Sequence, residues 1–190
     1  MNLNEMTIYI ISYYDNEYKV MKEKFKDCSN VEVVKNDFVI FMNETPGIEC
    51  IVSPANSYGH MDGGYDAAIS DYLGWDFQLQ VQKFIKDNYY GEQIVGTSFI
   101  INAPKNKKLI HTPTMVKPEI IIDDRIVYFS MRSTLICALK NNIKSIIIPL
   151  FGAGTGEVPI EIAAKHMYDA YMQILNAENG IYSVYGGNFY

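Results

Sequence analysis

The residues best suited to chemistry lie at positions 51–69, which read IVSPANSYGHMDGGYDAAI. An apolar strand ends there in small residues, Asn56 stands at its tip, and the pair Gly63-Gly64 opens a helix. Glycine lets the main chain approach a ligand closely, and the free N–H groups at a helix start favour anions. Asn56 carries both a donor and acceptors, which suits the hydroxyls of a sugar. This order of parts favours a ligand that carries phosphate.

A second glycine-rich turn follows another apolar strand. Residues 145–149 read SIIIP, residues 150–156 continue LFGAGTG, and Pro159 then opens a helix. Proline is favoured at a first helical turn because it has no N–H to satisfy. One glycine-rich turn says little, because tight turns need glycine anyway. Two of them, each after an apolar run, predict a diphosphate or phosphosugar held between two loops.

Length and composition indicate an ordinary globular chain. Its 190 residues predict a single domain spanning residues 1–190, with 48% apolar residues available for a core. A net charge of −6 argues against broad nucleic-acid binding, which needs a cationic surface, so we expect no nucleic-acid groove. Backbone amides and helix dipoles can still hold a diphosphate without lysine or arginine.

The three cysteines and three histidines are dispersed along the chain. They form neither a metal-ligand pattern nor an even disulfide framework, so we expect no metal, no other cofactor and a reduced, cytoplasmic protein. No apolar run reaches membrane-spanning length, and the N-terminus lacks the basic region of a signal peptide. We therefore expect no membrane partner, and a monomer by default.

Strand-like and helix-like segments alternate along the chain. Period-two apolar runs predict strands at residues 7–13, 31–34, 48–52, 94–102, 109–112 and 145–149, with an edge strand at 181–185. Helical spacing predicts helices at residues 16–25, 66–73, 75–88, 125–140 and 159–175, with a loop at 43–47. The alternation predicts an α/β fold, a three-layer α/β/α sandwich around a central mixed sheet. Both glycine loops then occupy the edge where strands end and ligands bind.

Four motifs stand out together: Asn36-Asp37-Phe38, Ser53-Pro54-Ala55-Asn56, residues 62–69 (DGGYDAAI) and residues 149–159 (PLFGAGTGEVP). Their combination resembles a macro domain, the ADP-ribose-binding module of the Appr-1-p processing family. The combination is specific although each motif alone is not, and it resembles a bacterial and phage branch most. The resemblance covers nearly the whole chain and implies the macro domain version of the fold.

The resemblance implies a role for each matched residue. Asp37 would accept the adenine amino group, Phe38 would flank the base, and Asn56 would hold the distal ribose. Asp66 matches an aspartate that hydrolytic members place near that ribose. The first phosphate loop would comprise Gly63, Gly64 and Tyr65, and the second would comprise Gly152, Ala153, Gly154, Thr155 and Gly156, with Phe151 as a further cleft-lining candidate.

Simpler interpretations of these residues stay open. Asp37 can cap a turn, and Asn56 can be a turn residue. Asp66 can interact favourably with the dipole of its helix, because it lies in the first turn. His60, inside the first loop, is either a general acid or base or a surface residue. Tyr185 would stack on adenine if the tail forms the last strand.

Some positions depart from the family pattern. Many macro domains have three consecutive glycines in the first loop, and Asp62 stands at the first of them here. Glu157 ends the second loop, which adds another carboxylate near a diphosphate. No residue matches the catalytic lysine of one hydrolase branch, because Lys105, Lys107 and Lys108 lie in a predicted solvated hairpin.

The resemblance implies ADP-ribose or an ADP-ribosylated substrate as the partner, and leaves the activity open. A hydrolase would release ADP-ribose from an acceptor, or phosphate from ADP-ribose 1″-phosphate, with Asn56 and Asp66 as catalytic residues. The alternative is a non-catalytic reader or sequestering protein for ADP-ribose or a related signalling nucleotide. A degenerate fold used for protein interaction would require side chains such as Tyr58 or Phe151 to fill the cleft.

Overall fold

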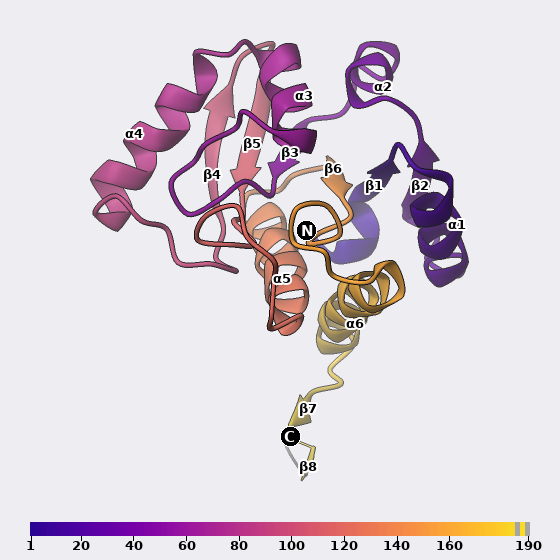
Figure 1. Cartoon of the computed structure of the whole chain (residues 1–190). Coiled ribbons are helices and arrows are strands. Elements are labelled where there is room, and N and C mark those ends of the chain that lie inside the picture. The colour runs from indigo at the N-terminus through magenta and orange to yellow at the C-terminus, as the bar shows by residue number, and fades with distance from the viewer. Residues whose placement is uncertain (185–186, 189–190) are drawn as a thin grey trace.

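A six-stranded mixed sheet forms the centre of the protein (Figure 1). The structure is a computed structural model that describes residues 1–184 and 187–188. Along the sheet the strand order is β2-β1-β6-β3-β5-β4, and only the β4–β5 pair is antiparallel. The strands are β1 (Thr7–Ser12), β2 (Val31–Lys35), β3 (Cys50–Ser53), β4 (Phe99–Ala103), β5 (Lys107–His111) and β6 (Ser145–Pro149).

Helices cover both faces of this sheet, which confirms the predicted three-layer α/β/α sandwich. One face packs against α1 (Asp15–Lys24), α5 (Arg125–Lys140) and α6 (Ile160–Glu178), and the other against α2 (Phe38–Glu44), α3 (Gly64–Leu73) and α4 (Phe77–Tyr89). A short 3-10 helix, η1 (Leu3–Glu5), precedes β1.

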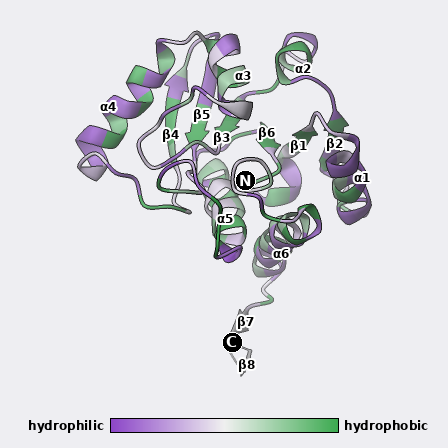
Figure 2. Cartoon of the chain, in the orientation of Figure 1, coloured by the Kyte–Doolittle hydropathy of each residue, from purple (hydrophilic) through white to green (hydrophobic). Residues whose placement is uncertain are grey.

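The strands are apolar on both sides because both sides are buried. In β6, Ile146 and Ile148 belong to the cluster under α5 and α6, whereas Ile147 belongs to the cluster under α3. Successive side chains of a strand point to opposite faces, so a continuous apolar run suits a strand between two helical layers. Figure 2 shows hydrophobic colour on the central strands and hydrophilic colour along much of α1 and α4.

Helix α2 is an element that the sequence interpretation missed. Asp37 is its N-cap, and its carboxylate accepts a hydrogen bond of 3.0 Å from the N–H of Ile40. Phe38 and Met42, one turn apart, are the buried residues of this short helix. The predicted loop at 43–47 therefore begins only after Glu44.

Several predicted boundaries also move. Strand β4 begins at Phe99 rather than residue 94, because residues 94–97 form a turn in which the Thr97 hydroxyl donates to the Ile94 carbonyl at 2.6 Å. Strand β5 begins at Lys107, which is buried and not in a solvated hairpin. Its amine donates to the carbonyls of Pro46 and Ile48, each at 2.6 Å.

The tail does not extend the central sheet as predicted. Strand β7 (Ser183–Val184) pairs antiparallel with β8 (Gly187–Asn188) in a separate two-stranded ribbon. Figure 1 shows this ribbon beyond the end of α6, away from the six-stranded sheet. Tyr185, predicted to stack on adenine, lies outside the described residues. In the described part of the chain, none of the helices is both long enough and apolar enough to cross a membrane.

Candidate functional site

A cleft of about 290 Å³ opens beyond the carboxyl ends of β3 and β6, and both glycine loops line it. The loops therefore converge on one site, as the sequence predicts. The lining residues are Pro54, Ala55, Asn56, His60, Asp62, Gly63, Gly64, Tyr65, Asp66, Thr114, Met115, Pro118, Pro149, Leu150, Gly152, Gly154, Thr155 and Gly156.

The first loop presents bare, exposed main chain to the cleft. Gly63 is the N-cap of α3, and Gly64 has a left-handed φ of +53° that favours glycine. A Cβ at either position would meet nothing within 4 Å, so no protein group fills the space beside them. The start of the loop is held by α3, where the Ser70 hydroxyl donates to the Met61 carbonyl at 2.7 Å. Free amides at a helix start and open space beside them suit an anion.

The second loop combines exposed and buried glycines. Gly154 and Thr155 are exposed, and a Cβ on Gly154 would meet nothing within 4 Å. Gly152 and Gly156 are buried, and Gly152 has a left-handed φ of +76°. The loop is thus open toward the cleft at its tip and packed against the protein at its two ends.

Asp66 is the cleft residue best placed to exchange a proton. It lies in the first turn of α3, is only 8% exposed, and accepts a 2.6 Å hydrogen bond from the Ser53 hydroxyl. Burial raises the pKa of its carboxyl to about 7, and the nearby charge of Asp62 adds to the rise. Hydrogen bonds from Ser53 and the Ala55 backbone oppose this by lowering the pKa. Such a carboxyl titrates near neutral pH, where general acids and bases work best.

Asn56 is buried and serves the turn as well as the cleft. Its Oδ1 accepts from the N–H of Tyr58 at 3.1 Å and of His60 at 3.4 Å, and its Nδ2 donates to the His60 carbonyl at 3.4 Å. The amide therefore fixes the start of the first loop, as the turn interpretation holds. It also lines the cleft, where its second N–H can meet a sugar hydroxyl.

Tyr65 is one of the cleft-lining residues, and its buried hydroxyl bonds to none of the residues the structure describes. Its ring packs edge-on against Phe38, with the ring centroids 5.0 Å apart. Burial raises the pKa of the Tyr65 hydroxyl well above its ordinary value, so it is a donor at neutral pH. A buried donor of this kind costs about 1–3 kcal/mol when it has no partner.

Four predicted site residues lie outside the cleft lining. Asp37 uses one carboxylate oxygen to cap α2, and Phe38 is buried against Tyr65 and Tyr72. The Phe151 side chain is fully buried in the hydrophobic core, which corrects its prediction as a cleft-lining group, and Ala153 packs against the same core.

Tyr58 does not fill the cleft either. It is exposed and donates to Glu92 at 3.1 Å. Because Phe151 lies in the core, neither Tyr58 nor Phe151 blocks the cleft. A degenerate fold used only for protein interaction would require such a block.

One further wall of the cleft was missed by the sequence interpretation. Thr114, Met115 and Pro118 line the cleft from the segment between β5 and α5. The carbonyl of Met115 accepts from the N–H of Ser57 at 3.1 Å, which ties this wall to the turn at Asn56. The only signal in the sequence was a proline-containing run after a strand, without glycine or periodicity.

The cleft is electrostatically poor in cations. Among the described residues that line it, none is lysine or arginine, while Asp62 and Asp66 are acidic. Within residues 1–184 and 187–188, no group of three His, Cys, Asp or Glu side chains has the arrangement of a metal site. A phosphate bound here would therefore rely on backbone amides.

A family model described as Macro domain matches residues 52–167 of the chain. The chain belongs to the macro domain family. An uncharacterised protein of Aquifex aeolicus (strain VF5) is 34% identical over 124 residues, which is 64% of this chain and 71% of that protein.

Solved macro domains share the fold of this macro domain at low sequence identity. The macrodomain of Mycobacterium tuberculosis DarG has a TM-score of 0.57 at 20% identity, covering 66% of this chain and 82% of that one. The Oceanobacillus iheyensis macrodomain with MES bound has a TM-score of 0.62 at 19% identity, covering 93% and 81%. The Trypanosoma brucei macrodomain in complex with ADP-ribose has a TM-score of 0.56 at 21% identity, covering 70% and 54%.

Proposed function

We propose that this macro domain binds ADP-ribose in the cleft between its two glycine loops and hydrolyses an ADP-ribose derivative there. The observation that carries the binding proposal is the convergence of exposed, unobstructed main chain at Gly63-Gly64 and Gly154 on one cleft. Such a cradle suits a diphosphate. The complex of the Trypanosoma brucei macrodomain with ADP-ribose supports the choice of ligand.

The observation that favours hydrolysis is the position of Asp66. A buried carboxyl with a pKa of about 7 stands at the start of the helix that the first loop opens. In its ionised form it takes a proton from water as the water oxygen bonds to the anomeric carbon of the distal ribose. The bond from that carbon to the acceptor oxygen breaks, and the acceptor leaves with the electron pair and takes the proton that Asp66 received from the water. Asn56 orients the distal ribose, and the loop amides stabilise the diphosphate.

The adenine is assigned to the side of the cleft nearest α2. Asp37 uses Oδ1 to cap the helix. Its other oxygen would accept from the adenine amino group, and the backbone of Phe38 would contact the base. We also propose that residues 1–190 act as one macro domain, because β1 pairs with β6 in the same sheet although β1 lies outside residues 52–167.

Calorimetry with ADP-ribose tests the binding proposal. We expect measurable heat for the wild-type protein, and the absence of both heat and a thermal shift at millimolar ADP-ribose would overturn the proposal. Incubation with an ADP-ribosylated protein and with ADP-ribose 1″-phosphate then tests turnover. Asn56→Ala and Asp66→Asn should abolish product release, whereas the exposed Asp76→Asn should not.

The pH profile sharpens the assignment of Asp66. If its ionised form is the base, kcat should rise with pH through about 7 and then level off. A flat profile between pH 5 and 9 would remove Asp66 from the chemical step.

The reader function is kept as a second candidate because of two observations. The Asn56 amide is already engaged by its own turn, and the exposed Asp62 adds negative charge to the cleft. Substrates that stay intact while ADP-ribose binds would favour the reader.

A further inference from the structure

The segment between β5 and α5 lines the cleft and contacts both the turn before the first glycine loop and the second glycine loop. We call residues 113–124 the strap. Its first part is tied to the turn before the first loop, where the N–H of Thr114 donates to the Pro54 carbonyl at 3.3 Å and the N–H of Ser57 donates to the Met115 carbonyl at 3.1 Å. Thr114, Met115 and Pro118 then form one wall of the cleft.

The second part of the strap is seated on the second glycine loop at Ile121. The N–H of Ile121 donates to the carbonyl of Gly156 at 2.9 Å. A Cβ built on Gly156 would lie 2.5 Å from Ile121 Cδ1 and 2.7 Å from the Gly152 carbonyl oxygen, and one built on Gly152 would lie 3.3 Å from Ile121 Cδ1. Ile121 therefore packs most closely on Gly156, whereas a Cβ on Gly152 would first meet Val127 at 3.0 Å and Val158 at 3.1 Å.

The space beside Gly156 is too small for a side chain. Gly156 does not have a left-handed φ, so its conformation is open to any residue. Glycine is required there for space alone, and Ile121 together with the Gly152 carbonyl occupies that space.

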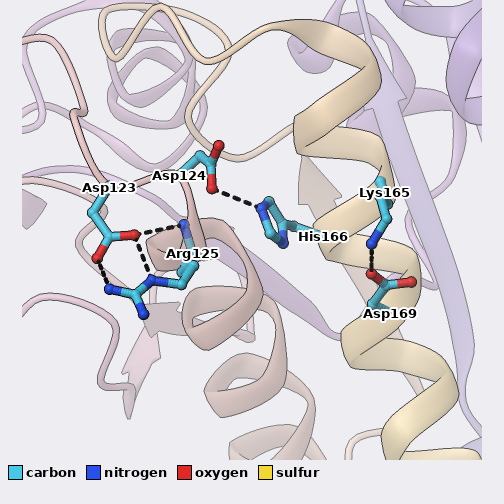
Figure 3. A network of polar contacts seen from close by, with 6 residues as sticks. All are labelled: Asp123, Asp124, Arg125, Lys165, His166 and Asp169. Atoms are coloured by element: carbon cyan, nitrogen blue, oxygen red, sulfur yellow. Dashed lines mark hydrogen bonds and ion pairs between the residues drawn. The ribbon is translucent and has the colours of Figure 1, made fainter.

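The far end of the strap is fixed to the neighbouring helices (Figure 3). Asp124, at the start of α5, accepts a 2.9 Å hydrogen bond from Nε2 of His166 on α6, and Asp123 pairs with Arg125 at 2.6 Å. The strap is thus attached before and after Ile121, so the isoleucine side chain is held against the loop.

We propose that Ile121 is a positioning residue for the second glycine loop, and that it holds the amides of residues 152–156 in the arrangement that receives the diphosphate and distal ribose. The inference rests on the proposed function for its ligand. Removing the side chain opens space behind Gly152 and Gly156, the loop relaxes into it, and its N–H groups lose their common direction.

Ile121→Ala and Ile122→Ala form a matched pair for the test, because Ile122 is the next residue and is 99% exposed. We expect Ile121→Ala to weaken ADP-ribose binding about tenfold, the effect of losing roughly one hydrogen bond to a charged group. Adenosine, which lacks the diphosphate and distal ribose, should bind both variants and the wild type equally. Ile121→Val, which lacks Cδ1 but keeps a Cγ, should cause a smaller loss of affinity than Ile121→Ala, and Ile122→Ala should match the wild type.

Amide hydrogen exchange gives a readout that needs no ligand. Ile121→Ala should speed exchange at residues 152–158 and leave residues 63–66 unchanged, and Ile121→Val serves if the alanine variant fails to fold. Unchanged exchange at residues 152–158, or unchanged ADP-ribose affinity in folded Ile121→Ala, would overturn the inference. Failure of the wild type to bind ADP-ribose would instead overturn the proposed function, while the exchange result still decides whether Ile121 braces the loop.

Discussion

The two glycine loops face the same cleft but are built differently. The glycines of the first loop, Gly63 and Gly64, are exposed and have no atoms near the place of a Cβ. In the second loop, Gly156 is buried against Ile121 and Gly152 against Val127 and Val158, and only Gly154 has open space. The same residue type is therefore required for two physical reasons: open access in the first loop, and tight packing at the ends of the second.

The loops also differ in their ionisable groups. The first loop leads into α3, whose first turn contains the buried Asp66. The second loop leads toward α6, and its cleft-lining residues, Leu150, Thr155 and three glycines, carry no ionisable side chain. The first loop thus supplies the titratable group of the site, and the second supplies shape. This difference between the loops can be tested by substitutions that change, one at a time, the open space at a glycine, the packing at a glycine and the charge of Asp66.

The largest effect of packing is expected from Gly156→Ala. The new methyl group would stand 2.7 Å from the Gly152 carbonyl oxygen, which cannot rotate away as a side chain can. Overpacking of this kind costs about 1–3 kcal/mol of unfolding free energy. Gly63→Ala is the matched control from the first loop, and as an N-cap change in open space it should cost less than about 1 kcal/mol. Urea unfolding of both variants checks the contrast, and equal losses would contradict it.

Asp66→Asn should stabilise the protein above neutral pH. Because folding raises the pKa of Asp66 from 3.8 to about 7, the folded state binds the extra proton between these values. Unfolding free energy therefore falls as pH rises through this window, by at most about 4 kcal/mol at pH 8. The asparagine variant lacks this loss. Urea unfolding at pH 4 and pH 8 should show its advantage only at the higher pH, and a pH-independent difference would contradict the raised pKa.

Gly154→Ala should separate binding from stability. Its backbone is not left-handed and its surroundings are open, so the unfolding free energy should change by less than about 1 kcal/mol. The methyl group would stand in the cleft, and ADP-ribose affinity should fall at least about tenfold, equivalent to roughly 1.4 kcal/mol. Calorimetry on the folded variant checks this. Unchanged affinity would show that the diphosphate does not approach Gly154.

The smallest effect concerns the attachment of the strap shown in Figure 3. Asp124→Ala removes the 2.9 Å hydrogen bond to His166, whose side chain is 18% exposed, and should cost about 1 kcal/mol. Lys165→Ala removes an exposed pair with Asp169 inside α6, and should cost no more than about 0.5 kcal/mol. Thermal unfolding of the two variants compares them. If only Asp124→Ala also speeds amide exchange at residues 152–158, the bracing extends to this end of the strap.

The sheet and its long helices were predictable because their patterns are strong. Residues 125–140 and 145–149 form α5 and β6 with the predicted bounds. A 16-residue amphipathic helix and a strand that is apolar throughout leave few alternatives. The convergence of the two glycine loops could also be predicted, because parallel strands end at one edge of a sheet.

The elements that were missed depend on tertiary contacts. Helix α2 has seven residues, too short for a clear periodic signal, and its cap Asp37 was interpreted mainly through a ligand role. Lys107 was expected in solvent, but it is buried because two carbonyls of a distant loop receive its amine. The strap has neither glycine nor periodicity, and only packing against Gly156 reveals its place. For Phe151, sequence spacing identified the loop but not that the side chain points into the core.

The position of β6 has a consequence for how the protein forms. Strands β1 and β2 make one half of the sheet, strands β3, β5 and β4 make the other, and β6 alone joins them. During synthesis the two halves cannot be united until residues 145–149 have left the ribosome. Because such non-local pairing is slow, both halves wait with an unpaired edge. The second glycine loop follows β6 directly, so the cleft is completed only when the sheet itself closes.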